Sequence, residues 1–168
     1  TTSVDEAAFL SCTGLFNDDT ETPEDYRDLL SAAARRALPM VCANPDRVVH
    51  RGEQLIWCAG ALADLYAELG GQVVMAGKPH APIYRCALDT VSELLGRPAD
   101  PARILCIGDG VGTDVAGANN QDLDCLFVCG GIHGEEILRA GEVEADLLDA
   151  FLARERARAA YAIPKLVW

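Results

Sequence analysis

Apolar residues along the chain follow two different periods. Short apolar runs bounded by Gly, Pro, Asn or Asp alternate with stretches in which apolar positions recur every three or four residues. The first pattern is typical of buried strands and the second of amphipathic helices. We expect strands at about 7–12, 40–43, 72–76, 103–107 and 125–128, and helices at about 22–38, 58–69, 82–95, 114–121, 134–140 and 144–158.

This order of elements predicts an α/β protein. The first 70 residues are expected to run strand–helix–strand–loop–helix, with 47–54 as a polar loop. From Gln72 onward the pattern is β-α-β-α-β-α, which favours a parallel sheet with helices on both faces. The apolar end, 161–168, is expected to pack as an irregular strand.

Composition and charge exclude several classes of function. The chain has 168 residues and a formal net charge of −12, which disfavours nucleic acid because phosphate binding relies on clusters of Lys and Arg. No apolar run approaches the roughly 20 residues of a membrane span, and the N-terminus lacks the pattern of a signal peptide. The seven cysteines form no CxxC pair, so we interpret them as reduced core residues of a cytoplasmic protein.

Two acidic residues follow the predicted strand 103–107. The segment Ile104–Asn120 reads ILCIGDGVGTDVAGANN and carries Asp109 directly after the strand and Asp114 at the start of the next helix. Ligands of open α/β sheets bind at the carboxyl ends of the strands. Since no basic residue separates the two carboxylates, they either repel each other or share a cation, and oxygen ligands suit Mg²⁺. A purely structural role, as a helix cap and a first-turn acid, is the alternative for each.

Lys78 follows the predicted strand 72–76, between Gly77 and Pro79. One helix separates this strand from the strand before Asp109, so a single crossover would bring both strand ends to the same edge of a sheet. A lysine and two acids at one edge indicate phosphoryl transfer, in which positioning and charge stabilisation dominate. The alternative is a surface lysine in a turn. His80 lies close enough in sequence to touch a substrate, whereas Asp18 and Asp19 are interpreted as turn residues.

The motifs Gly77-Lys78-Pro79 and Gly108-Asp109-(four residues)-Asp114 resemble motifs three and four of the haloacid dehalogenase (HAD) superfamily of phosphohydrolases. Ala43-Asn44-Pro45-Asp46 followed by Gly60-Ala61-Leu62 is similar to subfamily IIA, which holds the NagD-like phosphatases. The resemblance covers about residues 40–133. It implies a Rossmann-like core with an inserted α/β cap, and Mg²⁺-dependent attack of an aspartate on a small phosphorylated substrate such as a sugar or nucleotide phosphate.

The resemblance also implies roles for individual residues. Lys78 would stabilise the phosphate, Asp109 would ligate Mg²⁺ and act in catalysis, and Asp114 would assist as a second metal-site acid. Asn44 and Asp46 would lie in the cap and, with His80, help to select the substrate. Residues 1–75 would then be part of the cap, and 76–168 the C-terminal half of the core.

The chain departs from the family pattern at one point. The Asp-x-Asp nucleophile that follows an N-terminal strand in the family is absent, and Asn17-Asp18-Asp19-Thr20 does not replace it. We therefore expect a fragment without turnover of its own, whose strand 103–107 has an open edge. That edge predicts a homodimer or pairing with the missing N-terminal segment. The alternative function is a non-catalytic phosphate-binding or assembly module; a dinucleotide-binding domain is disfavoured because no GxGxxG follows a strand.

Overall fold

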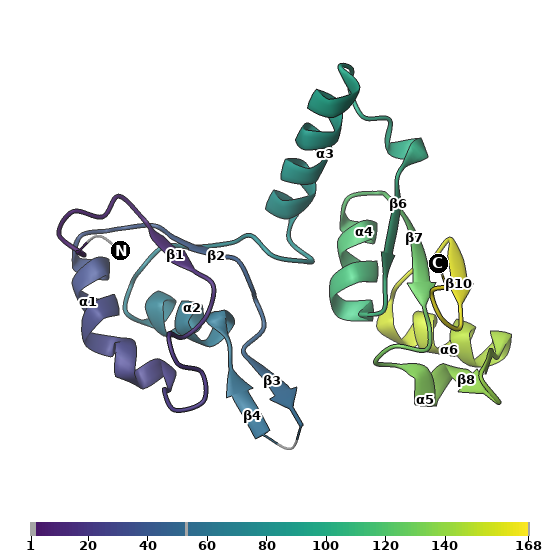
Figure 1. Ribbon diagram of the computed structural model, residues 1–168, viewed down its shortest axis with the longest axis horizontal. Coiled ribbons are helices and arrows are strands. Elements are labelled where there is room, and N and C mark those ends of the chain that lie inside the picture. Colours follow the sequence, from purple (N-terminus) through teal and green to yellow (C-terminus); the bar gives the residue numbers. More distant parts are fainter. Residues whose placement is uncertain (1–2, 53, 168) are drawn as a thin grey trace. The chain divides into compact units, whose positions relative to one another are not determined.

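The chain folds into two compact units. The computed structural model describes residues 3–52 and 54–167. The units are Thr1–Gly77 and Lys78–Trp168, so the chain divides directly after Gly77, where the sequence predicted a boundary after residue 75. Each unit has its own parallel sheet and its own core. Figure 1 shows the helices and strands of both units. The protein is thus of the mixed α/β class that the sequence predicted.

The first unit is built on a three-stranded parallel sheet in the order β1-β2-β5. Its apolar core contains Met40 and Tyr66, which are almost fully buried. The elements of this unit are β1 (Leu10–Cys12), η1 (Pro23–Tyr26), α1 (Arg27–Arg35), β2 (Met40–Cys42), β3 (Val48–Arg51), β4 (Gln54–Trp57), α2 (Ala59–Glu68) and β5 (Val73–Met75).

The predicted helix start at Thr22 is confirmed, although its first turn is a 3-10 helix. Pro23 occupies the first turn, where its missing N–H costs nothing. Asp25 Oδ2 accepts hydrogen bonds from the Thr22 backbone N–H at 2.7 Å and from its hydroxyl at 2.9 Å. These bonds satisfy groups that a helix end leaves without partners, which is why the helix begins here.

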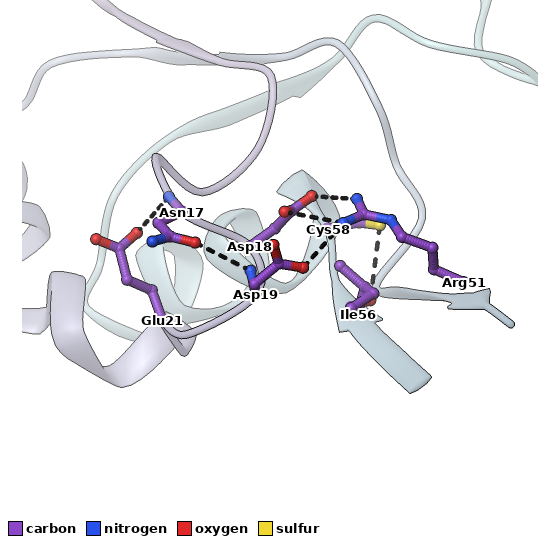
Figure 2. Close-up of polar contacts among 7 residues, drawn as sticks. All are labelled: Asn17, Asp18, Asp19, Glu21, Arg51, Ile56 and Cys58. Carbon is purple, nitrogen blue, oxygen red and sulfur yellow. Dashed lines mark hydrogen bonds and ion pairs between the residues drawn. The ribbon is translucent and has the colours of Figure 1, made fainter. Parts of the chain in front are cut away.

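The sequence did not predict the hairpin β3–β4. Residues 47–54 were expected to be a polar loop, but Val48–Arg51 pairs antiparallel with Gln54–Trp57. Arg51 extends from this hairpin to the loop before η1 and forms ion pairs with Asp18 and Asp19 (Figure 2). Asp18 and Asp19 lie in a turn, as the sequence predicted, and also contact the hairpin through Arg51.

The second unit contains a parallel sheet in the order β10-β7-β6. Its core lies on the side of this sheet that carries Phe127, which stacks on Phe151 with ring centroids 6.1 Å apart. The elements are α3 (Ala81–Leu95), η2 (Pro101–Arg103), β6 (Leu105–Gly108), η3 (Val111–Val115, a π-helix), α4 (Ala116–Asn120), β7 (Asp124–Val128), α5 (Gly134–Ile137), β8 (Leu138–Arg139), β9 (Glu142–Val143), α6 (Ala145–Glu155) and β10 (Tyr161–Ile163).

One predicted connection in this region is wrong. Strand β5, which precedes Lys78, pairs with β2 of the first unit and not with β6. The strands before Lys78 and before Asp109 are therefore not neighbours in one sheet. The apolar pattern of 72–76 identifies a buried strand but does not say which sheet receives it. A second, smaller correction is that the predicted helix 134–140 ends at Ile137 and gives way to the hairpin β8–β9.

Helix α3 has the predicted amphipathic pattern, but none of its residues is buried. Its main anchor in the unit is Tyr84, which packs against the core around α4. A Cβ atom on Gly117 would lie 2.0 Å from the Tyr84 hydroxyl oxygen, so the missing side chain allows this contact. On β6, Leu105 and Ile107 are 44% and 45% exposed. Apolar surface therefore remains open on both elements.

All seven cysteines are free in the structure, and four of them lie in strands β1, β2, β6 and β7. Burial raises the pKa of the Cys12 and Cys125 thiols to about 11, which leaves little reactive thiolate near neutral pH. Across the part of the chain that the structure describes, no helix is long and apolar enough to span a membrane.

Candidate active site

The candidate site is built at the carboxyl end of β6. The strand ends at Gly108, and Asp109 and Gly110 lead into the π-helix that carries Asp114. The Gly110 backbone N–H donates to Asp114 Oδ2 at 3.0 Å. A Cβ atom on Gly108 would lie 2.3 Å from Asp114 Cγ. Glycine at position 108 therefore allows the Asp114 carboxylate to lie directly against the strand end.

Asp109 is held by the loop that follows the neighbouring strand β7. Its Oδ2 accepts a hydrogen bond from the Ile132 backbone N–H at 3.3 Å. A Cβ atom on Gly131 would lie 2.1 Å from the same oxygen, so a second glycine makes room for the second carboxylate. Because β6 and β7 are parallel, with Gly108 opposite Phe127, the two acids and both loops share one edge of the sheet.

Lys78 reaches this edge as the first residue of the second unit. Its ammonium group forms an ion pair with Asp114 Oδ1. The Asp114 side chain is 13% exposed, whereas the Lys78 side chain is 54% exposed. A pair this accessible contributes little to stability. Its main consequence is positional, because a cation is held beside the acids while most of its surface remains available to an anion.

A histidine that the sequence analysis did not select lies next to this edge. The Val111 backbone N–H donates to His133 Nε2 at 3.4 Å, and the His133 ring lies 4.8 Å from the Phe151 ring. His133 thus joins the loop after β7 to the loop after β6. Its position just after Gly130-Gly131, at the end of a predicted strand, was the signal available in the sequence.

Two side chains beside the site are held neutral by burial. Desolvation raises the pKa of the Tyr84 hydroxyl to about 12, and also raises the pKa of the Cys106 thiol. The nearby Asp114 carboxylate acts in the same direction on both groups. Neither side chain therefore supplies a base near neutral pH.

Comparison with known proteins points to one family. Residues 75–152, which contain Lys78, Asp109 and Asp114, match the family model described as HAD-hydrolase-like. A haloacid dehalogenase-like family hydrolase from Brucella suis 1330 is 46% identical over 99% of this chain, with a TM-score of 0.67. The second half of the chain thus matches the haloacid dehalogenase-like family, and the chain as a whole is similar to one hydrolase of that family.

Other solved structures share the fold. A p-nitrophenyl phosphatase from Archaeoglobus fulgidus is 25% identical over 98% of this chain, with a TM-score of 0.68. A hypothetical protein from Pyrococcus horikoshii OT3 is 19% identical over 97% of the chain, with a TM-score of 0.67. This chain spans 58%, 56% and 53% of the Brucella, Archaeoglobus and Pyrococcus chains. No curated protein matches the sequence.

The haloacid dehalogenase-like family implies a metal ion, and the donor set can be compared with it. Asp109 and Asp114 offer carboxylate oxygens, the ligands that Mg²⁺ takes. Within residues 3–52 and 54–167 there is no group of three or more His, Cys, Asp or Glu side chains arranged to hold a metal. Mg²⁺ commonly keeps several waters and uses one or two carboxylates. The two acids therefore fit part of a magnesium site.

The predicted substrate residues fall in different places. Asn44 and Asp46 lie in the first unit, where Asn44 Oδ1 accepts the Asp46 backbone N–H at 3.0 Å in a tight turn. A Cβ atom on Gly60 would lie 2.2 Å from the Pro45 carbonyl oxygen, so this turn packs directly on the start of α2. His80 belongs to the second unit and is exposed at the N-terminal end of α3.

Proposed function

We propose that this chain carries the phosphate-binding lysine and the acid pair of a HAD-type phosphatase. Its substrate would be a small phosphorylated metabolite, such as a sugar or nucleotide phosphate. The observation that supports the proposal most directly is the ion pair of Lys78 with Asp114 at the edge of the sheet that also holds Asp109. The name of the Archaeoglobus relative, a p-nitrophenyl phosphatase, favours the same chemistry.

Each side chain has a distinct role in this proposal. Lys78 binds and neutralises the phosphate oxygens, and its partner Asp114 sets the position of the ammonium group. Asp109 ligates Mg²⁺ with support from the Ile132 N–H, and Asp114 is the second acid of the metal site. When bound, Mg²⁺ supplies positive charge that stabilises the phosphate in the transition state. Asn44, Asp46 and His80 are proposed to select the substrate.

The nucleophile is proposed to come from outside the described residues. Asp122-Leu123-Asp124 has the Asp-x-Asp spacing, but Asp124 is the first residue of β7, so this segment lies at the end of the sheet opposite Asp109. Strand β6 is an edge strand with exposed Leu105 and Ile107, which suits a further strand. We infer that such a strand, from the remainder of the protein or from another chain, carries the attacking aspartate.

The absence of an Asp-x-Asp nucleophile after a strand in the sequence also favours a second function. A chain with this lysine and these acids but no nucleophile could bind a phosphorylated ligand, or assemble with a partner, without hydrolysing anything. Hydrolysis and phosphate binding both require phosphate to bind at Lys78, whereas assembly with a partner does not. The two functions differ in turnover, which must appear when the attacking aspartate is supplied if the protein is an enzyme.

The chain offers a matched pair of variants for testing the site, because Lys78 and Lys165 are its two lysines. Inorganic phosphate would be titrated into the chain with and without Mg²⁺, and binding followed by calorimetry. Lys78→Ala should weaken phosphate binding about tenfold or more, since it removes a charge-assisted contact. Lys165→Ala should leave it unchanged. Equal affinities for wild type and Lys78→Ala would exclude the proposed site.

A further inference from the structure

The hairpin β3–β4 has two different faces. Its register places Val49 opposite Ile56 and Arg51 opposite Gln54. Side chains of directly opposed residues share a face, and successive residues alternate. One face therefore carries Val49, Arg51 and Ile56, and the other carries Val48, Leu55 and Trp57.

The first of these faces is turned toward the hairpin's own unit. Ile56 is only 4% exposed, although Val49 opposite it is 37% exposed. Arg51 forms ion pairs with Asp18 at 2.7 Å and with Asp19 at 3.0 Å, and Figure 2 shows its guanidinium beside both carboxylates. The hairpin is thus held on one side, and its other face is directed away from the core.

That outer face is apolar and open. Val48, Leu55 and Trp57 are 37%, 56% and 40% exposed. Together they expose two aliphatic groups and an indole ring on one face of the hairpin. A two-stranded hairpin is only marginally stable unless it packs against further strands or a helix. Clustered exposed apolar side chains of this kind mark interaction surfaces.

The edge of β4 is also open for pairing. Among the described residues, β3 is the one strand that pairs with β4. The Cys58 N–H donates to the Arg47 carbonyl at 2.8 Å, so position 58 has its backbone groups turned inward toward β3. Because inward and outward groups alternate in an antiparallel ladder, Trp57 and Leu55 direct their N–H and C=O groups outward.

The charges on β3 and β4 indicate which strand of the hairpin can pair with the same strand of a second copy. Strand β4 reads Gln-Leu-Ile-Trp and carries no charge, whereas β3 follows Arg47 directly and ends with Arg51. Natural edge strands usually carry charges that prevent pairing, and β4 lacks this protection. In a chain with a net charge of −12, a neutral strand can meet its own copy without like charges facing each other across the strands.

We propose that the β4 strands of two copies of this chain pair antiparallel and form a symmetric dimer. With the two-fold axis at Ile56, Leu55 of each copy lies opposite Trp57 of the other. The outward N–H and C=O groups of both residues then bond across the axis. The two hairpins become one four-stranded sheet, and the Leu55 and Trp57 side chains of both copies form a single apolar cluster on its outer face.

Sedimentation equilibrium of the full chain tests this interface. The wild-type chain should be a dimer whose dissociation constant rises about tenfold or more in Leu55→Lys, because like charges then meet near the axis. Leu29→Lys is the matched control, since Leu29 is 46% exposed on α1 and lies outside the hairpin. Leu105→Lys tests the open edge of β6 in the same way. A monomeric wild type, or a dimer weakened by Leu105→Lys and not by Leu55→Lys, would overturn the proposal.

Hydrogen exchange on the wild-type chain gives a test that needs no folded variant. The amides of Leu55 and Trp57 should exchange more slowly as the protein concentration rises, whereas the Ile56 amide, which faces β3, should change little. Contact through side chains alone would not protect these two amides in particular. Equal exchange of Leu55 and Trp57 at low and high concentration would also overturn the proposal.

Discussion

At the scale of single residues, two glycines determine how closely the acids of the candidate site approach the backbone. Gly108 lies against Asp114 and Gly131 lies against Asp109, and in each case a Cβ atom would fall within 2.5 Å of a carboxylate atom. Real Cβ atoms do not make such contacts, so any side chain at these positions must displace the acid. The positions of both carboxylates therefore depend on glycine.

We predict that Gly131→Ala weakens metal binding by displacing Asp109. Removing the support of a ligand commonly costs about ten- to a hundredfold in metal affinity, and Gly131→Ala should fall in this range. Titration of the chain with Mg²⁺ by calorimetry measures the effect. Gly134→Ala is the control, because a Cβ atom there would make ordinary contacts at 3.6 and 3.8 Å. Unchanged Mg²⁺ affinity in Gly131→Ala would argue against a metal role for Asp109.

The sequence indicated candidate residues for the site but not the contacts that support them. Lys78 and Asp109 stand beside glycines after predicted strands, and Asp114 follows five residues after Asp109, a pattern visible in the sequence itself. His133 was missed because its value depends on a contact with Val111, a residue far away in the chain. Arg51 was missed for the same reason, since its partners Asp18 and Asp19 are on another loop.

At the scale of elements, α3 depends on very few contacts. It buries none of its own residues, and Tyr84 is its main anchor to the core. The helix is nevertheless well formed at its ends, with Pro82 in the first turn and Gly96 in a left-handed conformation at the C-terminus. Local sequence thus defines the helix, while one aromatic side chain fixes its place in the unit.

We predict that Gly117→Ala destabilises the packing of α3. The new Cβ atom would lie 2.0 Å from the Tyr84 hydroxyl oxygen, and overpacking of this kind costs about 1–3 kcal/mol. Urea denaturation measures the free energy of unfolding. The control is Gly112→Ala, because a Cβ atom at Gly112 would meet nothing within 4 Å. A Gly117→Ala chain as stable as the control would show that Tyr84 does not anchor α3.

The predictions of secondary structure were wrong where the result depends on which strands pair with each other. Residues 47–54 were expected to be a loop because charged and polar residues lie on both sides of Val48-Val49. The segment instead contributes to a hairpin. Strand 72–76 was found where expected, but in the sheet of the first unit. A strand pattern in the sequence reports burial and not the identity of the neighbouring strand. Helix periodicity, which depends on local geometry, placed α2 and α6 well.

At the scale of the whole molecule, each unit has a core of its own and the described residues lack one part of the proposed chemistry. The lysine and acids lie together in the second unit, but no Asp-x-Asp follows a strand in the sequence. Positioning and charge stabilisation cannot replace the attacking group in a mechanism with a covalent phosphoenzyme. The chain by itself should therefore show no turnover.

We predict that the 168-residue chain releases no phosphate from p-nitrophenyl phosphate above background, with or without Mg²⁺. The p-nitrophenyl phosphatase from Archaeoglobus fulgidus serves as the positive control in the same colorimetric assay. Lys78→Ala should be indistinguishable from the wild-type chain. Metal-dependent release that disappears in Lys78→Ala would contradict the prediction and place the nucleophile within this chain.

The ion pair of Lys78 with Asp114 also makes the molecule simple to observe. With just two lysines in the chain, selective isotopic labelling of lysine gives two side-chain NMR resonances, one of them from the candidate site. That resonance shifts when an anion draws the ammonium group away from Asp114, while the Lys165 resonance serves as an internal standard. A single spectrum can then survey a library of phosphorylated compounds without any enzymatic assay.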